Sequence, residues 1–289
     1  MQTLHRKSRD DSLHPGVRMK PRTRLVDFSV IWLILAGLSL VVLWEGLVFA
    51  FDVPRWKLPA PSDIGVELLD SRGLLLSHTW VTLQEIIIGF SVALSTGLLL
   101  AILISYYKAV GRLVYPIVIA SQTIPIIVIA PLLLIWVGYG LTPKIIVVTL
   151  IAFFPIVVNT VDGLRSVDPE MINLMRTLGA TRWQIFTKVQ IPSSLPFLFS
   201  GTKVGATLSV IGAVIGEWVG SNAGLGYLTR ISVPLFLTPR SFAAVLILSL
   251  LGIGIFLLVA LLERALLPWH HRNSDPNREI QSQIKGATG

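Results

Sequence analysis

The stretch DPEMINLMRTLGATRWQIFTKVQIPSSLPF, residues 168–197, is amphipathic and basic, although it lies between two strongly apolar segments. The whole chain is 53% hydrophobic and only 14% charged, and its mean hydropathy is +0.73. A soluble domain of 289 residues needs more polar surface than this, so the composition indicates a membrane protein. The polar stretch is therefore expected to lie outside the bilayer, whereas most of the remaining chain is expected to lie within it.

Within this stretch, the residue pattern predicts a first short helix that ends at a glycine. Asp168, Pro169 and Glu170 form a typical helix start, with a capping carboxylate, a proline at the first helical position and an acid in the first turn. Gly179 is expected to end the helix, because glycine adopts a positive φ without steric cost. Between these ends, apolar residues recur with helical spacing at Met171, Leu174, Met175 and Leu178.

A second helix is predicted to follow directly. Thr181 and Gln184 have the spacing of a capping box, and Pro192 and Pro196 are expected to close the helix before the next span. Isolated helices of this length are marginal in water, so the pair must dock on something. It either rests on the bilayer or plugs into the groove of a cytoplasmic partner. The double capping and the apolar side chains favour the plug.

Six apolar runs predict six transmembrane helices and therefore an all-α membrane fold. A span needs about 20 residues to cross ~30 Å of hydrocarbon. The runs lie near 28–51, 86–105, 113–137, 145–161, 198–219 and 242–262. The first run is too long for a signal-peptide core and is expected to be retained. After it, Ser62 or Asp63 is expected to cap a helix that lies at the membrane interface.

The distribution of basic residues predicts the orientation of these spans. With a cytoplasmic N-terminus, the inner segments carry 17 Lys and Arg residues and the outer segments carry 6. Such an excess is typical of cytoplasmic loops, so both termini are expected to be cytoplasmic. The predicted parts are a basic tail at 1–25, a transmembrane domain at 26–268 with a cytoplasmic loop at 163–196, and a polar tail at 269–289. The net charge of +8 is then explained by the orientation of the spans in the membrane, and no nucleic-acid partner is expected.

The sequence contains few groups that could perform chemistry. It has no cysteine, and no catalytic, metal or cofactor site is expected. It also lacks a Gly-x4-Gly-Lys-Ser/Thr phosphate loop, so ATP-driven transport would require hydrolysis on another chain. Acidic residues near the predicted span ends are expected to be solvated at the interface: Glu45, Glu85, Asp162, Glu217 and Glu263.

Polar groups within the spans are candidates for the lining of a translocation path. Ordinary interhelical hydrogen bonding is the alternative interpretation. Glu217 is favoured further as a gate or as a contact for an external binding protein. The candidate residues are Gln122, Thr123, Pro125, Asn159, Ser209 and Glu217.

Small residues recur every four positions in the fifth predicted span. This spacing lets helix backbones approach closely, and the expected partner is the third span or a symmetry mate. The residues are Gly201, Gly205, Ser209 and Ala213.

Together these features resemble the permease subunits of binding-protein-dependent ABC importers, in the sulfonate, nitrate and taurine branch. The pattern of that family's EAA loop is matched at Gly179, Ala180, Phe186, Ile191 and Pro192. The Glu-Ala-Ala itself is replaced by Asn173, Leu174 and Met175. From Leu58 onward, the segments LPAPSDI, QTIPIIVIAPLLLIWVGYG, FFPIVVNTVDGLRSVDPEM and GEWVGSNAGLGYL extend the resemblance over nearly the whole chain.

The resemblance implies a type I importer permease fold in the bacterial inner membrane, working as a homodimer. Its partners would be two ABC ATPase subunits, which bind the ATP, and an external solute-binding protein. A cytoplasmic coupling helix would dock into the ATPase through Asp168, Glu170, Asn173, Leu174, Met175, Leu178, Gly179, Ala180, Phe186 and Pro192.

Alternatives remain for the transported solute and for the class of transport protein. WVGYG and NTVDGLRSVDPEMINLMRTLGA are most similar to permeases for the thiamine pyrimidine precursor or riboflavin. Sulfonate, taurine and nitrate are the other solutes. A secondary transporter or channel would show inverted repeats and midplane ionisable groups, and a membrane-embedded enzyme would show a clustered catalytic constellation. The sequence shows none of these patterns.

Overall fold

The computed structural model describes residues 24–268, with side chains described at Trp32 and from Ile34 onward. Apart from residues 24 and 25, the predicted tails at 1–25 and 269–289 lie outside the described residues. The chain divides into two units, residues 1–51 and 52–289. The described residues of the first unit contain the helix α1 (Arg24–Ala50), which covers most of the first predicted span.

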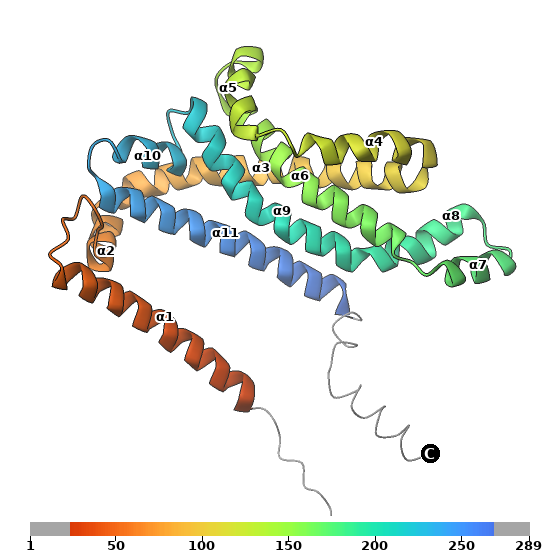
Figure 1. Cartoon of the computed structure of the whole chain (residues 1–289), viewed down its shortest axis with the longest axis horizontal. Helices are drawn as coiled ribbons and strands as arrows, with labels where there is room; N and C mark the ends of the chain where they lie inside the picture. The colour runs from red at the N-terminus through yellow and green to blue at the C-terminus, as the bar shows by residue number, and fades with distance from the viewer. Residues whose placement is uncertain (1–23, 269–289) are drawn as a thin grey trace, which may run out of the picture. The chain divides into compact units, whose positions relative to one another are not determined.

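Four long helices form the body of the second unit. In Figure 1 they lie side by side; α6 contacts both α3 and α9, and α11 contacts α9. Each belongs to a helical segment that is long and apolar enough to cross a membrane. They are α3 (Arg72–Tyr106), α6 (Leu141–Arg165), α9 (Ile191–Gly220) and α11 (Thr238–Leu266).

The small residues of α9 bring its backbone directly against α6. A Cβ on Gly201 would lie 2.5 Å from the Pro155 carbonyl oxygen, and one on Gly212 would lie 2.9 Å from the Val148 Cα. The predicted close packing is therefore present, but within this chain the third predicted span is not its main partner, and packing against a symmetry mate stays a prediction. The partner is α6, which corresponds to the fourth predicted span, because α6 runs antiparallel along α9 whereas the third predicted span is broken.

This third predicted span, 113–137, forms two helices. α4 (Lys108–Ser121) and α5 (Ile126–Val137) are bent by 100° relative to each other. Pro125, the N-cap of α5, has no N–H and disfavours a helical residue before it, so α4 cannot continue through this point. α4 packs on α3, whereas α5 contacts α6 and α9 and projects from the row of long helices (Figure 1).

Short helices stand at both ends of the row. α2 (Pro61–Asp70) and α10 (Leu225–Ser232) lie at one end, and α7 (Pro169–Thr177), α8 (Arg182–Ile185) and the π-helical η1 (Phe186–Gln190) lie at the other (Figure 1). The predicted interfacial helix corresponds to α2. At its start the Asp63 carboxylate accepts a hydrogen bond from the Ala60 N–H at 3.3 Å.

An ion pair ties α2 to α11. Arg240 donates to Glu67 Oε1 at 2.8 Å, and the Ser71 hydroxyl donates to the same oxygen at 2.6 Å. Burial raises the pKa of Glu67, but the bonds from Ser71 and Arg240 outweigh it, so the pKa lies below its ordinary value. The ionised carboxylate is therefore favoured by this packing.

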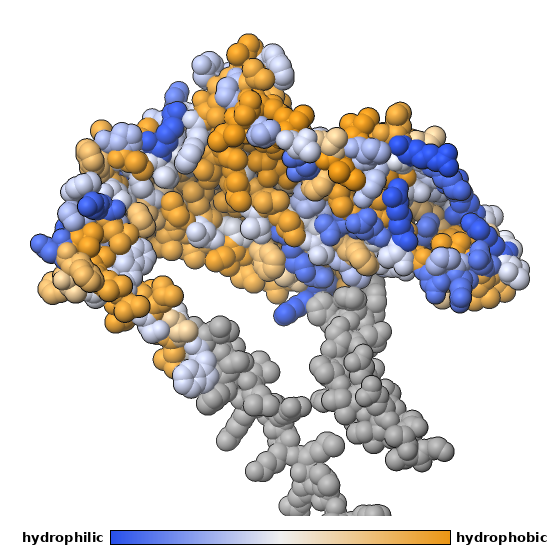
Figure 2. Space-filling model, in the orientation of Figure 1, coloured by the Kyte–Doolittle hydropathy of each residue, from blue (hydrophilic) through white to orange (hydrophobic). Residues whose placement is uncertain are grey.

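The surface separates into a hydrophobic middle and hydrophilic ends. Figure 2 shows hydrophilic side chains gathered around α7 and α8 and again around α2 and α10, with hydrophobic side chains between them. This is the pattern of a chain that crosses a bilayer. Among the described residues four helices are long enough to span, or five if α4 and α5 form one broken span. In α1 the same test covers only residues 34–50, so the count of six spans stays a prediction.

Candidate functional site

Eight of the ten residues expected to contact an ATPase lie in α7 or directly beside it, whereas Phe186 and Pro192 lie in η1 and α9. The Asp168 carboxylate accepts from the Glu170 N–H at 2.8 Å, and Pro169 stands in the first turn of the helix. At the other end, the Gly179 N–H donates to the Arg176 carbonyl at 2.9 Å, and Gly179 has a φ of +77°. Glycine adopts this φ without the strain that a Cβ would bring, so local sequence signals define both ends of α7.

α7 carries an apolar surface that the described part of the chain leaves uncovered. Met171, Leu174 and Leu178 are 48%, 55% and 73% exposed, and no residue of α7 is buried. Met175, the fourth residue of the predicted stripe, is half-buried. Large apolar side chains on an otherwise hydrophilic end of the molecule fit the docking of a partner protein.

Polar contacts hold the turn between α7 and α8. The Gln184 N–H donates to Thr181 Oγ1 at 3.3 Å, and the Thr181 N–H donates to Gln184 Oε1 at 2.8 Å, which is the predicted capping box. Within α7, Arg176 donates to Asn173 Oδ1 at 3.5 Å. Ala180 is half-buried between the two helices. The turn therefore has a defined shape.

The second helix does not end at Pro192 and Pro196, contrary to expectation. Residues 182–220 form one apolar helical segment through α8, η1 and α9. The Ile191 N–H bonds to the Phe186 carbonyl across the wider π turn. Pro192 then falls in the first turn of α9, where a missing N–H is tolerated. The polar turn is thus continuous with a membrane-crossing helix.

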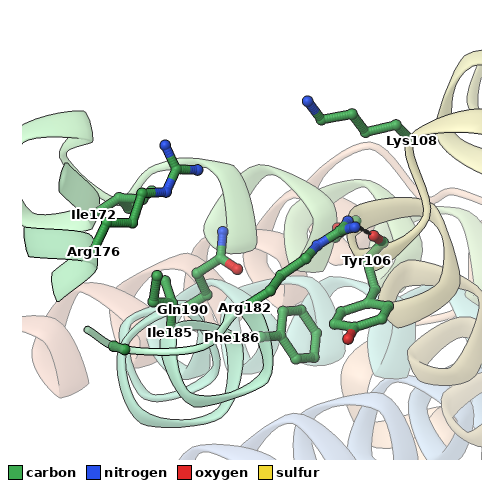
Figure 3. Close-up of a pocket in the computed structure, with 10 residues that line it drawn as sticks. Tyr106, Lys108, Ile172, Arg176, Arg182, Ile185, Phe186 and Gln190 are labelled. Carbon is green, nitrogen blue, oxygen red and sulfur yellow. Dashed lines mark hydrogen bonds between the residues drawn. The ribbon is translucent and has the colours of Figure 1, made fainter.

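A cavity of about 380 Å³ lies between the α7–α8 turn and the junction of α3 with α4 (Figure 3). Phe186, expected to contact the ATPase, is 2% exposed in its wall and packs on Tyr106 with ring centroids 5.1 Å apart. The Arg182 guanidinium lies 4.7 Å from the Tyr106 ring centroid and donates to the Tyr106 carbonyl. Lys108 and Arg176 complete a basic lining. None of the described residues that line this cavity is acidic.

Three of the predicted path residues lie at the break between α4 and α5. Gln122, Thr123 and Pro125 are all exposed there, and the Thr123 hydroxyl donates to the Ala120 carbonyl at 2.7 Å. Backbone outside a helix is tolerated at membrane depth only where protein covers it or where it lines water. The break is therefore where a second protein or an aqueous path must adjoin the chain.

Asn159 and Ser209 lie away from this break: Asn159 is in α6 and Ser209 is in α9, and these two helices pack on each other. The Asn159 amide donates to the carbonyl four residues earlier at 2.8 Å, and its Cβ faces Gly201. Ser209 is fully buried and donates to a carbonyl of its own helix at 2.6 Å. Within the described part of the chain, no hydrogen bond joins either residue to Gln122 or Glu217.

Glu217 is buried at the end of α9 and holds the segment that leads to α10. Its Oε1 accepts from the Thr82 hydroxyl at 2.6 Å. Its Oε2 accepts from the N–H groups of Gly226 at 2.5 Å and Tyr227 at 3.1 Å. Gly224 has a φ of +111°, and a Cβ there would overlap the Glu217 carboxyl group. Glycine is thus required at positions 224 and 226, because a side chain at either position would meet the Glu217 carboxylate.

Lys144 joins the same segment to α3 and α6. Its Nζ lies 2.6 Å from Glu85 Oε1 and donates to Ser221 Oγ at 2.6 Å. Glu85 Oε2 is buried and has no hydrogen-bond partner in the described part of the chain. We refer to Thr82, Glu85, Lys144, Glu217 and Ser221 as the buried ionic network.

The expectation that acids near the span ends are solvated was wrong for three of them. Glu85, Glu217 and Glu263 are 0%, 0% and 8% exposed. Glu263 forms an ion pair of 2.8 Å with Lys203. Acids in membrane helices commonly face the protein interior and pair with a base, and that is the arrangement here.

Sequence reasoning missed Thr82, Glu85 and Lys144 as members of one site. The available signal was a lone glutamate and a lone lysine beside two different apolar runs. Their pairing depends on α3 and α6 being neighbours, which the sequence pattern does not determine.

Comparison with known proteins places the chain among transport proteins. Residues 93–268 match the family described as binding-protein-dependent transport system inner membrane component. The formylaminopyrimidine transport permease protein ThiX of Halalkalibacterium halodurans is 42% identical, over 81% of this chain and 94% of its own length. The riboflavin transport system permease protein RibX of Chloroflexus aurantiacus is 37% identical, over 88% of this chain and 97% of its own length.

Solved structures share the fold at lower identity. A chain of the inward-facing MetNI methionine ABC transporter superposes with a TM-score of 0.60 and 24% identity, over 68% of this chain and 97% of its own. A chain of an amino acid ABC transporter gives a TM-score of 0.56 and 17% identity, over 69% of this chain and 97% of its own. Over the parts that superpose, both share the helical fold of this chain.

Proposed function

Since the chain belongs to the family of binding-protein-dependent transport system inner membrane components, we propose that it imports an aminopyrimidine precursor of thiamine. The observation that carries this proposal is the 42% identity to a formylaminopyrimidine permease over nearly the whole of that protein. Riboflavin is the second candidate solute, because a riboflavin permease is 37% identical over a similar span. Sulfonates, taurine and nitrate are the remaining alternatives.

Membership of this family identifies the type of transporter. The chain is a multi-pass inner-membrane permease subunit of an ABC importer, and the alternatives of a secondary transporter, channel or membrane enzyme are set aside. We place ATP hydrolysis on a separate chain, because the sequence has no phosphate loop. Positive charge on the predicted inner segments supports cytoplasmic termini.

The proposed ATPase contact is the exposed side of α7. Met171, Leu174 and Leu178 present apolar side chains at a hydrophilic end of the molecule. Helix-in-groove recognition uses side chains at such spacing. The Asp168 cap keeps this short helix ordered, and the Thr181 cap of α8 fixes the turn that follows it, before α7 meets a partner.

A second copy of the chain is the proposed neighbour of α5. α5 has 12 residues, which gives a length of about 18 Å, so it cannot cross the hydrocarbon core alone. Ile135, Trp136 and Tyr139 at its far end are 78%, 69% and 83% exposed. The non-helical backbone between α4 and α5, inside the third predicted span, requires cover at membrane depth. A homodimer would supply this cover and would place the α4–α5 breaks, with Gln122 and Thr123, beside a shared path.

Glu217 is proposed to control the other end of the path. The carboxylate fixes the α9–α10 segment by three hydrogen bonds and is itself buried, so it would act by holding this segment in place and not by touching the binding protein. Asn159 and Ser209 are proposed to line the path only if α6 and α9 separate during transport.

The coupling contact is tested in the complete transporter, reconstituted in proteoliposomes with its ATPase and binding protein. Leu174→Asp should abolish solute-stimulated ATP hydrolysis, because a carboxylate cannot enter an apolar groove without a partner. Gly179→Pro should do the same, because proline cannot adopt the φ of +77°. Leu69→Asp is the matched control, since Leu69 of α2 is an exposed leucine like Leu174, at 73% against 55%. Full stimulation in the Leu174 variant would reject α7 as the contact.

The solute is tested by copurification. The tagged chain is expressed with the products of its neighbouring genes and extracted in mild detergent, and the proteins that accompany it are identified. The accompanying binding protein should gain thermal stability with formylaminopyrimidine, more than with riboflavin. Stabilisation by riboflavin alone would select the second candidate, and stabilisation only by sulfonates, taurine or nitrate would overturn both.

A further inference from the structure

We propose that the cavity beneath the α7–α8 turn binds a phosphate group, and that the headgroup of an anionic phospholipid supplies it. The site is independent of the solute, whereas its role in orienting α7 rests on the proposed ATPase contact. The inference rests on the charge of the cavity, on the arrangement of its basic side chains and on its depth in the membrane.

The cavity is basic and has no counter-charge of its own. Lys108, Arg176 and Arg182 line it, and none of them forms an ion pair within the described residues. Lys108 is also the first residue of α4, a 14-residue helix whose N-cap, Tyr107, makes no side-chain capping bond. The free N–H groups of such a helix start add positive potential. A phosphate would neutralise this charge.

The basic side chains surround the space. Figure 3 shows the Lys108 amine and the Arg176 guanidinium on opposite sides of it, with the Gln190 amide between them and the Arg182 guanidinium beside Tyr106. A phosphate offers several strong acceptor oxygens, which an ammonium and two guanidinium groups can share.

The aromatic side chains around the cavity indicate its depth. Tyr106 packs edge-to-face on Tyr107 at 5.1 Å and on Trp183 at 6.0 Å, directly after the apolar run of α3. Tyr107 and Trp183 are 51% and 60% exposed. Tyrosine and tryptophan gather at the level of lipid headgroups. Basic pockets at this level on the cytoplasmic side suit anionic headgroups, so a lipid is favoured over free phosphate.

The position of the cavity gives the lipid a role. Ile172 and Arg176, one turn apart on α7, line the cavity, whereas Leu174 and Leu178 are exposed. A bound headgroup would therefore hold α7 from one side and leave its apolar side free. Bound lipid would orient the helix.

The first experiment measures lipid retention by the full-length chain. The protein is purified in mild detergent, and native mass spectrometry counts the bound phospholipids. Lys108→Gln and Arg176→Gln should each weaken retention of phosphatidylglycerol about fivefold, and together about 25-fold. Arg112→Gln is the matched control, because Arg112 is an exposed base of α4 outside the cavity lining. Equal retention by the double variant, or equal loss in the control, would overturn the proposal.

The second experiment separates the two sources of phosphate. Thermal unfolding of the wild type is followed while phosphatidylglycerol, phosphatidylcholine or inorganic phosphate is added. Stabilisation by phosphatidylglycerol alone, absent in Lys108→Gln, supports the lipid site. Equal stabilisation by inorganic phosphate would overturn the lipid as its source, and no stabilisation would overturn the site. Lys108→Gln suffices if Arg176 variants fail to assemble, because the Lys108 amine makes no bond within the described chain.

Discussion

At the scale of single residues, Gly224 and Glu217 compete for the same space. A side chain at position 224 would be strained at a φ of +111° and would also displace the carboxylate. Gly224→Ala should therefore cost about 3 kcal/mol or more, from backbone strain and from N–H groups that lose their acceptor. Thermal unfolding in detergent, followed by tryptophan fluorescence, measures the loss.

Gly138→Ala is the control for this prediction. Gly138 also has a positive φ, of +87°, but a Cβ there would meet no atom within 4 Å. Only the strain remains, about 1 kcal/mol. If both alanine variants unfold at the same temperature, the contact with Glu217 contributes nothing to stability.

Lys144 is the single base that compensates the Glu85 carboxylate in the buried ionic network. Lys144→Met should destabilise the chain by about 3–5 kcal/mol, because it leaves a buried charge unpaired. The double variant Glu85→Gln with Lys144→Met should recover most of this loss, since it removes both charges. A double variant as unstable as Lys144→Met would show that packing, and not charge, causes the loss. The same unfolding assay serves.

Residue-scale features were predictable where they depend on neighbours in sequence. The cap at Asp168, the turn at Gly179 and the capping box at Thr181 each involve contacts within four residues, and the structure contains all three. The pair of Glu85 and Lys144 spans 59 positions and depends on which helices adjoin. No local pattern carries that information.

At the scale of elements, the tie between α2 and α11 should depend on pH. The pKa of Glu67 is lower in the folded chain than its ordinary value, so the ionised carboxylate stabilises the fold above the unfolded pKa of about 4.3. This stabilisation is lost as the pH falls through the folded pKa. The unfolding temperature of the wild type should therefore fall more between pH 7 and about pH 3 than that of Glu67→Gln. Parallel pH profiles would contradict a role for this pair.

The apolar runs predicted where helices lie in the sequence, but they did not predict where those helices bend or continue. The run at 113–137 contains enough hydrophobic residues for a span, yet the chain turns by 100° within it. Pro125 was the visible signal, and its effect depends on whether neighbouring helices satisfy the freed backbone groups. Similarly, Pro192 suggested a helix end, but the π turn before it lets the helix continue.

At the scale of the whole molecule, orientation is testable because the natural chain has no cysteine. Asn222→Cys, an exposed position between α9 and α10, should react with an impermeant thiol reagent from outside intact cells. Thr181→Cys should react only after the membrane is opened. Ser221, beside Asn222, is 4% exposed and serves as an unreactive buried control. The reverse labelling pattern would invert the proposed topology.

The continuity of residues 182–220 has a mechanical consequence. A helix of 39 residues is about 58 Å long, and it begins at the turn that holds α7 and ends just beyond Glu217. Because α6 packs against α9 from Gly201 to Gly216, the two helices would move as one body, and a rocking of about 10° about the middle of the segment would carry each tip through about 5 Å. The chain thus contains a stiff lever: a displacement applied to the arm that carries the α7–α8 turn reappears, reversed in direction, at the arm that contacts the α9–α10 segment.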